Sequence, residues 1–352
     1  MIAPARIAAF EALSEVSSER LDLSDAVAAA RRSLGDDRDR ALAAEIAIGV
    51  QRWRATLDHL IAHFSKRPLD RLDREVVEIL RLSAYQLLHL TRVPASAVVD
   101  DAVKLTGRAG KRSASGLVNA VLRALSRSRH ALPLPARPEH IDDRVGMLDY
   151  LSITLSHPRW LAGRWVGRYG FEATEAWLRF NNASAPLTLR ANRLRNTPDE
   201  LLQRLADDGI IVARGRYAPD ALIVEEGQPL GGGGLDQGWF VVQDEASQLL
   251  TLLTGSDPGR RVLDTCASPG GKTTAIAAGM HGSGLLVACD VRDRRMALLR
   301  RTVTASGAAN VRLAQADLRR PLPFAQPFDC VFVDAPCSGL GTLRRDPYIK
   351  CR

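Results

Sequence analysis

Residues 261–273 read Arg-Val-Leu-Asp-Thr-Cys-Ala-Ser-Pro-Gly-Gly-Lys-Thr, an apolar run that ends in an Asp and passes through two glycines toward a helical segment. Three more apolar runs that end in an Asp follow, at 285–290, 311–317 and 328–334. Helical segments lie near 273–278 and 294–306, and 318–323 favours only a short turn. Strands that alternate with helices predict a parallel, doubly wound α/β sheet.

The ends of these four predicted strands, the first at 262–264, share one feature. Each is an aspartate, namely Asp264, Asp290, Asp317 and Asp334. One such Asp is a common turn residue, but four in register are harder to explain as turns. Because ligands of parallel sheets bind at the carboxyl ends of the strands, we expect the four carboxylates to converge on one crevice.

The loop after the first strand runs from Asp264 to Thr273 and carries Gly270 and Gly271. Glycines let a ligand approach the backbone, and a helix N-terminus favours an anion. A nucleotide-triphosphatase loop would need glycine where Cys266 stands, and the dinucleotide pattern GxGxxG is missing. Asp290 lies roughly twenty residues after the glycine loop, which is the spacing at which a carboxylate accepts hydrogen bonds from the ribose hydroxyls of an adenosine. S-adenosylmethionine has both the adenosine and the carboxylate that these loops favour.

The fourth predicted strand leads into Asp334-Ala335-Pro336-Cys337-Ser338-Gly339. A lone cysteine is more often an inert core residue, but one at a strand end beside glycine is placed for reactivity. Carbon 5 of cytosine is a poor nucleophile until a thiolate adds to carbon 6, so cytosine methylation needs a cysteine beside the methyl donor. Cys337 is therefore a candidate catalytic residue.

The other parts of the 352-residue chain predict a multidomain protein. Residues 1–130 have the apolar spacing and caps of a helical bundle, and prolines at 131–140 indicate an extended linker. Residues 141–234 begin with helices that are rich in aromatic residues. At helical spacing these aromatic side chains are more often packed in a core than stacked on bases, so we expect core packing. A small α+β unit similar to an RNA-recognition fold follows. Its helix begins with the capping box Thr197-Pro198-Asp199-Glu200. The sheet domain, 235–352, opens with a predicted strand at 239–242.

The composition narrows the possible partners and compartments. A formal net charge of +8 suits an acidic polymer such as RNA, although an arginine-rich proteome would give the same excess. No stretch is apolar for long enough to span a membrane, and the N-terminus lacks a signal peptide's apolar core. The five cysteines form no CxxC pair of a zinc site. We therefore expect a cytoplasmic protein without a metal.

The motifs taken together resemble those of the bacterial RNA cytosine-5 methyltransferases of the RsmB (Sun/Fmu) type, which act on small-subunit (16S) ribosomal RNA. The glycine loop, Asp290 with Arg295, Asp317 and the Asp334-Ala-Pro-Cys337 motif carry the resemblance in the sheet domain. The segments 49–54, 93–95 and 118–123 carry it in the helical part, where they resemble a NusB-like RNA-binding domain. The resemblance covers nearly the whole chain and implies a Rossmann-like methyltransferase domain at 235–352.

The resemblance also implies the role of each site residue. The donor, S-adenosylmethionine, would be wrapped by the loop residues Cys266, Ala267, Ser268, Pro269, Gly270, Gly271 and Lys272. Asp290 would hold the ribose, Asp317 the adenine amino group, and Asp334 the methionine end and the target base. In this family the thiolate that attacks carbon 6 comes from a later Thr-Cys motif, and Cys337 would assist product release.

That later Thr-Cys motif does not occur in the sequence, and Cys351, the one cysteine after Cys337, stands in a different context. We therefore expect a C-terminally truncated chain with an incomplete sheet, lacking the main nucleophile, and a protein that is monomeric at full length. Two other functions remain open. One is a noncatalytic RNA-binding protein that keeps the cofactor pocket; the other, weakened by Cys266, is a nucleotide triphosphatase.

Overall fold

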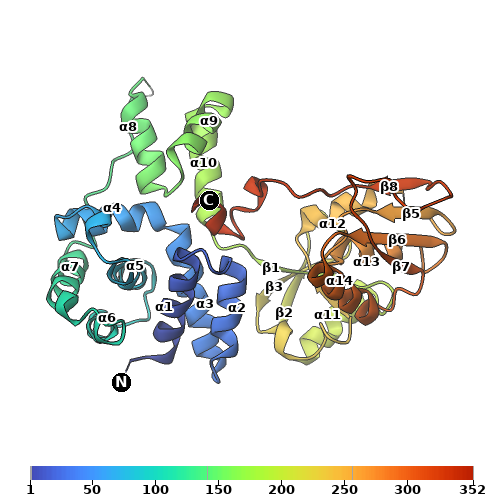
Figure 1. Ribbon diagram of the computed structural model, residues 1–352, viewed down its shortest axis with the longest axis horizontal. Helices are drawn as coiled ribbons and strands as arrows, with labels where there is room; N and C mark the ends of the chain where they lie inside the picture. The colour runs from blue at the N-terminus through green and yellow to red at the C-terminus, as the bar shows by residue number, and fades with distance from the viewer. Residues whose placement is uncertain (1, 141, 256, 352) are drawn as a thin grey trace. The chain divides into compact units, whose positions relative to one another are not determined.

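The computed structural model describes residues 2–140, 142–255 and 257–351. The chain divides into two compact units (Figure 1). The first unit comprises Met1–Ser184 together with Ser338–Arg352, and the second comprises Ala185–Cys337. Among the described residues, no helix is both long and apolar enough to cross a membrane.

The first unit is built from helices. They are α1 (Pro4–Ser17), α2 (Leu23–Arg32), α3 (Asp37–Arg52), α4 (Arg54–Ser65), η1 (Leu69–Arg71), α5 (Arg74–His89), α6 (Ala95–Arg108), η2 (Arg112–Ala114), α7 (Ser115–Arg127), α8 (Arg144–Asp149), η3 (Tyr150–Thr154), α9 (Arg159–Tyr169), α10 (Phe171–Asn182), η5 (Leu340–Thr342) and η6 (Pro347–Cys351).

Helices α1 to α7 pack into a bundle around a continuous apolar core, which confirms the predicted helical domain (Figure 1). Leu13, Ile46, Leu80 and Leu122, from four different helices, are all fully buried in this core. One buried ion pair lies among them, since Arg6 bonds to Asp101 and its Nε donates to Gln86 Oε1 at 2.8 Å. Pairing and hydrogen bonding offset the cost of burying these charges.

Helices α8 to α10 form a smaller apolar cluster around Tyr150, Leu151 and Leu178. The prediction that the aromatic residues of this region pack into a core is wrong for two tryptophans and one phenylalanine. Trp160 is 59% exposed, Trp177 40% and Phe180 47%. Helical spacing identifies an apolar face, but it does not tell whether another element covers that face.

The second unit contains two sheets. Its elements are β1 (Leu187–Ala191), α11 (Pro198–Asp207), β2 (Ile211–Arg214), β3 (Ala221–Glu226), η4 (Pro229–Gly231), β4 (Phe240–Val242), α12 (Glu245–Leu252), β5 (Arg261–Asp264), α13 (Gly271–Gly279), β6 (Leu285–Asp290), α14 (Asp293–Ser306), β7 (Val311–Gln315) and β8 (Cys330–Phe332).

The first sheet is antiparallel, with strand order β2-β3-β1-β4, and α11 packs on it (Figure 1). Helix α11 begins with the predicted capping box, in which Glu200 N donates to Thr197 Oγ1 and Thr197 N donates to Glu200 Oε2. The predicted α+β unit is thus confirmed. Strand β4, which we expected to open the following domain, is hydrogen-bonded to β1 instead.

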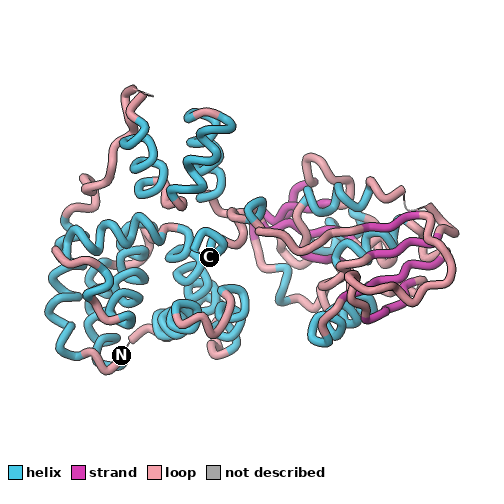
Figure 2. Tube along the Cα trace, turned by 45° about the horizontal axis from the view of Figure 1, so that its top comes forward, coloured by secondary structure: helices cyan, strands magenta, loops and turns pink. Residues whose placement is uncertain are grey.

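The second sheet is parallel, with strand order β7-β6-β5-β8, and confirms the predicted parallel α/β arrangement (Figure 2). Helices α13 and α14 pack on one face, against Val262, Leu286 and Ala288. The other face, with Leu263 and Val287, is packed by Leu322, Phe324 and Phe328 from a segment without helix. The strand order reverses between β5 and β8, which agrees with the doubly wound prediction. Within the described residues, however, helices pack on one face, and the crossover to β8 that covers the other face has no helix. Strand β8 lies at an edge, and β7 and β8 are shorter than predicted.

Candidate functional site

The four aspartates lie at or just after the carboxyl ends of the parallel strands. Asp264 and Asp290 are the last residues of β5 and β6, and Asp317 and Asp334 each follow their strand by two residues. The strand order places them along one edge of the sheet in the sequence Asp317, Asp290, Asp264, Asp334. A crevice at this edge is where parallel α/β sheets bind their ligands.

The glycine loop between β5 and α13 is fastened to its neighbours on both sides. Thr265 N and Oγ1 each donate to Phe332 O at 3.0 Å, and Ala267 N donates to Cys289 O at 2.8 Å. Ser268 Oγ donates to Arg295 O at the start of α14. Gly270 has φ +105°, and a Cβ there would lie 3.0 Å from Leu299 Cδ1. The loop thus needs glycine at 270 and presents the first-turn amides of α13, which have no acceptor within the helix.

Asp264 supports the loop from beneath. Its side chain is buried, and Oδ2 accepts a hydrogen bond from Thr273 Oγ1 at 2.7 Å. Burial raises the pKa of the Asp264 carboxyl to about 6, although the bond from Thr273 opposes the shift. Asp264 therefore holds the first turn of α13, a structural role beyond the one expected for the four carboxylates, and its Oδ1 has no hydrogen-bond partner among the described residues.

Asp290 has the geometry expected of a ribose-binding carboxylate. It is 5% exposed, and Oδ1 accepts hydrogen bonds from Val291 N at 2.8 Å and Arg292 N at 3.4 Å. Oδ2 has no hydrogen-bond partner among the described residues, and Arg295 Nη1 lies 3.7 Å from it. A buried carboxylate oxygen without a partner is costly, so a ligand hydroxyl would satisfy it. The residues therefore fit an adenosine-containing cofactor.

The two outer aspartates are paired with cations. Asp317 accepts from Arg319 N, Nε and Nη2, and these bonds lower the pKa of its carboxyl to about 2. Asp334 Oδ2 lies 2.7 Å from Lys272 Nζ, so the last position of the predicted donor loop is tied to the end of β8. The Asp317 carboxyl therefore remains ionised at neutral pH, and both side chains have oxygens that can accept hydrogen bonds from a ligand.

Cys337 lies three residues after Asp334 and is exposed, whereas the other four cysteines are buried or half-buried. Burial raises the pKa of the Cys266 thiol, and it raises the pKa of Cys289 to about 11. A thiol is reactive as the thiolate, so neither Cys266 nor Cys289 suits nucleophilic chemistry at neutral pH.

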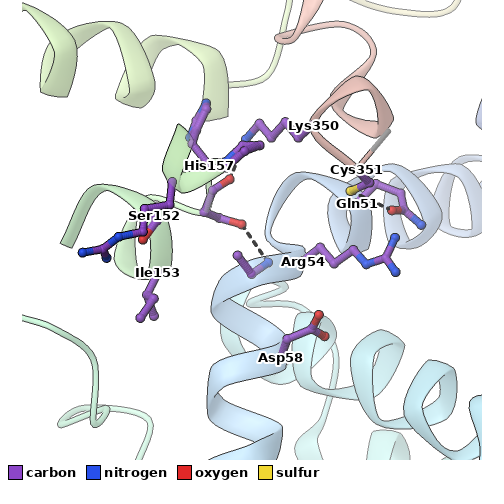
Figure 3. Close-up of a pocket in the computed structure, with 12 residues that line it drawn as sticks. Gln51, Arg54, Asp58, Ser152, Ile153, His157, Lys350 and Cys351 are labelled. Carbon is purple, nitrogen blue, oxygen red and sulfur yellow. Dashed lines mark hydrogen bonds between the residues drawn. The ribbon is translucent and has the colours of Figure 1, made fainter. Parts of the chain in front are cut away.

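Cys351 belongs to the first unit, where it lines a cavity of about 410 Å³ (Figure 3). Its thiol donates to Gln51 Oε1 at 3.6 Å, and burial raises its pKa. The neighbouring Lys350 ammonium donates to Arg52 O, Ser156 O and Asn182 Oδ1. These contacts give Cys351 and Lys350 a packing role and argue against Cys351 as a nucleophile.

Arg190 is a site residue that sequence reasoning missed. This β1 side chain is 3% exposed and bonds to Gln243 Oε1 and Gly271 O, while Nη2 donates to Thr274 Oγ1 at 2.7 Å. It thereby connects the antiparallel sheet to the N-terminus of α13. The available signal was an arginine inside an otherwise apolar predicted strand, since a buried charge needs partners.

Replacing Asp264 with Asn is expected to change how stability depends on pH. The folded-state pKa of Asp264 lies above the value of 3.8 for an exposed Asp, so its protonation favours folding at low pH. That contribution is lost as the pH rises through about 6. Relative to the parent, D264N should gain up to about 3 kcal/mol between pH 4 and pH 7.5. Urea unfolding at a series of pH values measures the difference.

Asp317→Asn provides the matched control because its pKa is shifted in the opposite direction. The Asp317 contribution is present above the ordinary pKa of an aspartate and is lost as the pH falls toward 2. An unfolding free energy of D264N that runs parallel to that of the parent across this range would contradict the assigned burial of Asp264.

Comparison with protein families divides the chain into three matched regions. Residues 3–127 match the NusB family, residues 157–231 match a ferredoxin-like domain of RsmF/B-like methyltransferases, and residues 251–352 match the 16S rRNA methyltransferase RsmB/F family. These matches correspond to the helical bundle, the antiparallel sheet region and the parallel sheet. Together with the site, they define a multidomain methyltransferase.

Curated relatives match over nearly the whole chain. Ribosomal RNA small subunit methyltransferase B of Pseudomonas putida is 34% identical over 98% of this chain and 76% of the relative. The probable ribosomal RNA small subunit methyltransferase B of Bacillus subtilis is 32% identical, with coverage of 89% and 69%. The chain therefore belongs to the RsmB/F family of 16S rRNA methyltransferases, which confirms the resemblance found in the sequence.

A solved structure shares the fold. The crystal structure of PH0851 superimposes with a TM-score of 0.79 at 24% identity, covering 100% of this chain and 78% of that one. At 24% identity this similarity shows that the two proteins share a fold, and nothing about function. It supports the order of helical, antiparallel-sheet and parallel-sheet regions along the chain.

Proposed function

We propose that the protein methylates carbon 5 of a specific cytosine in small-subunit ribosomal RNA with S-adenosylmethionine as donor. The observation that carries the proposal is Asp290 Oδ2, a buried carboxylate oxygen beside the glycine loop that has no hydrogen-bond partner among the described residues. It suits a ribose hydroxyl, as the first-turn amides of α13 suit the donor's carboxylate. When bound, the donor would supply an electrophilic methyl group.

Each remaining site residue has a proposed role at this edge of the sheet. The loop from Cys266 to Lys272 would wrap the donor, and Arg295 would help to hold Asp290 in place. Asp317 would accept from the adenine amino group. Asp334, oriented by Lys272 at 2.7 Å, would meet the methionine end and the target base. In each of these roles the carboxylate oxygens accept hydrogen bonds from the ligand.

Cytosine chemistry explains why a cysteine is needed. A thiolate adds to carbon 6, carbon 5 becomes nucleophilic and takes the methyl group, and loss of the carbon 5 proton then expels the thiolate. We assign Cys337 to this last stage, product release, because it is exposed three residues after Asp334. The family places the attacking thiolate in a Thr-Cys motif, and none of the five cysteines stands in such a motif at the later position.

The test is transfer of a labelled methyl group to unmodified small-subunit RNA, followed by nuclease digestion and mass spectrometry of the nucleosides. The assay is run with this chain and with a version extended to the length of its relatives. We expect label in 5-methylcytidine. In the extended version, where the family's attacking thiolate is expected, the variant C337A should accumulate a denaturation-resistant complex of protein and RNA, because release of the adduct fails.

Two results would overturn the proposal. Label on a cytosine amino group or on another base would exclude carbon 5 chemistry. Donor and RNA binding by both versions without any transfer would favour the alternative, a noncatalytic RNA-binding protein that keeps the cofactor pocket.

A further inference from the structure

Helix α10 carries an ordered stack of flat side chains on its outer face. The rings of Trp177 and Phe180 are nearly parallel, with centroids 5.4 Å apart and an interplanar angle of 15°. The guanidinium carbon of Arg344 lies 4.4 Å from the Phe180 centroid, and Trp165 of α9 meets Trp177 edge-on at 6.4 Å. We call Trp165, Trp177, Phe180 and Arg344 the aromatic ladder.

Trp165 packs against the apolar core of these helices, but Trp177 and Phe180 are not part of that core. That core contains Tyr150, Phe171 and Leu178, whereas Trp177 is 40% exposed and Phe180 47% exposed. Leaving two large aromatic side chains half in water forfeits a substantial part of their burial free energy. Neighbouring exposed aromatic rings of this kind mark binding surfaces more often than isolated exposed residues do.

The ladder is also fixed before any ligand arrives. Arg344 Nη2 donates to Ser184 O at 2.6 Å and Nε donates to Ala183 O at 3.3 Å, so the guanidinium plane is held over Phe180. Trp177 is held between Phe180 and Trp165. Because the rings are already ordered, a flat ligand that stacks on them loses less side-chain entropy on binding.

The charges around the ladder select the kind of ligand. Arg164, Arg168 and Arg179 of α9 and α10 are exposed. The acidic residues of the same two helices are Glu172 and Glu175. Both are paired with Arg137, and Glu175 is also paired with Arg179, so the positive charge near the ladder comes from Arg164, Arg168 and Arg344. The pairing leaves a face that is positive and aromatic, which is the combination that grips single-stranded nucleic acid through its phosphates and its bases.

We propose that the aromatic ladder stacks unpaired bases of the RNA substrate. The inference rests on the proposed function for the identity of the RNA, and it goes further by naming how single-stranded nucleotides are held. The segment that carries Cys337 also supplies Arg344, seven residues later in the chain.

The experiment measures binding of fluorescent single-stranded 12-nucleotide RNA to the full chain by anisotropy, without cofactor. Trp177→Leu and Phe180→Leu keep an apolar side chain but remove the ring. Each should weaken binding roughly five- to hundredfold, as loss of one stacked base does. Trp160→Leu is the matched control, since Trp160 is 59% exposed on α9 but is not part of the ladder.

A second probe separates stacking from charge and from folding. An abasic 12-mer keeps the phosphates but offers no bases, so W177L and the parent should bind it equally. For the normal 12-mer, the ratio of the parent's affinity to that of W177L should be the same at low and at physiological salt, because stacking releases no counterions. Circular dichroism melting confirms that each variant folds.

Unchanged RNA affinity in both ladder variants would overturn the inference and would make a protein surface the better occupant of the ladder. Equal losses in W177L and W160L, or equal losses on the abasic RNA, would overturn it as well. Binding is measured without methyl transfer, so failure of the proposed activity and failure of the ladder give different results.

Discussion

Replacing Arg190 with Met is expected to destabilise the second unit by about 2 to 4 kcal/mol and to weaken cofactor binding along with it. Three hydrogen bonds are lost at once, to Gln243 Oε1, Thr274 Oγ1 and Gly271 O. The first two are buried, whereas Gly271 O is part-buried and keeps a bond from Thr274 Oγ1. A buried acceptor left without a partner costs about 1 to 3 kcal/mol.

Part of this loss is offset. Burial lowers the pKa of Arg190 to about 10, because removing the charged guanidinium from water costs free energy. Methionine removes that cost and fills much of the volume, so the net effect is smaller than the sum of three lost bonds. The effect on the cofactor comes from Gly271, since its carbonyl is the contact that fixes the start of α13.

Urea unfolding and calorimetric titration with S-adenosylmethionine measure the two effects. Arg193→Met is the control, because Arg193 pairs with Asp220 at a 52% exposed position, where an ion pair contributes about 1 kcal/mol or less. An R190M protein that unfolds at the parent's urea concentration and binds donor equally well would show that the antiparallel sheet does not support the loop.

The sequence contains enough local information to predict most of the strands and the identity of the site. Strand β6 has the predicted bounds, and Asp264 and Asp290 end their strands as expected. Apolar runs, glycines and a terminal Asp are features of neighbouring residues, so a single sequence displays them. The same holds for the capping box at Thr197.

Features that depend on pairing between distant segments were not predicted. Strand β4 has a clear strand pattern, but its partner β1 lies about fifty residues earlier, and nothing within β4 specifies that choice. Arg190 is similar, since its acceptors lie 53 to 84 positions away. The exposure of Trp177 and Phe180 depends on whether another element covers α10, which helical periodicity does not contain.

Asp264 shows that identical signals can hide different roles. The four strand-end aspartates look alike in sequence, and both Asp264 and Asp290 keep one buried oxygen without a hydrogen-bond partner among the described residues. Their surroundings differ: Asp264 is bonded to Thr273 in the first turn of α13, whereas Arg295 lies 3.7 Å from the open oxygen of Asp290. The difference arises from three-dimensional surroundings, and it decides which aspartate to replace when testing cofactor binding.

Replacing Asp290 with Ala is expected to weaken S-adenosylmethionine binding roughly ten- to hundredfold. The carboxylate would accept hydrogen bonds from the ribose hydroxyls, and bonds to a charged group contribute about 1.5 to 3 kcal/mol, or about one to two powers of ten in affinity. Calorimetric titration of the parent and variant with the donor measures the loss.

Two further variants identify its cause. Asp290→Asn keeps an oxygen for Val291 N, which donates to Oδ1 at 2.8 Å, but removes the charge, so it should preserve the fold and lose part of the affinity. Asp293→Ala removes an exposed carboxylate three residues later that bonds to Gln315, and it should leave donor affinity unchanged. Equal affinity in the parent and D290A would refute the cofactor assignment. Equal losses in D290A and D293A would indicate a general effect of negative charge at this edge of the sheet and would likewise contradict a specific contact from Asp290.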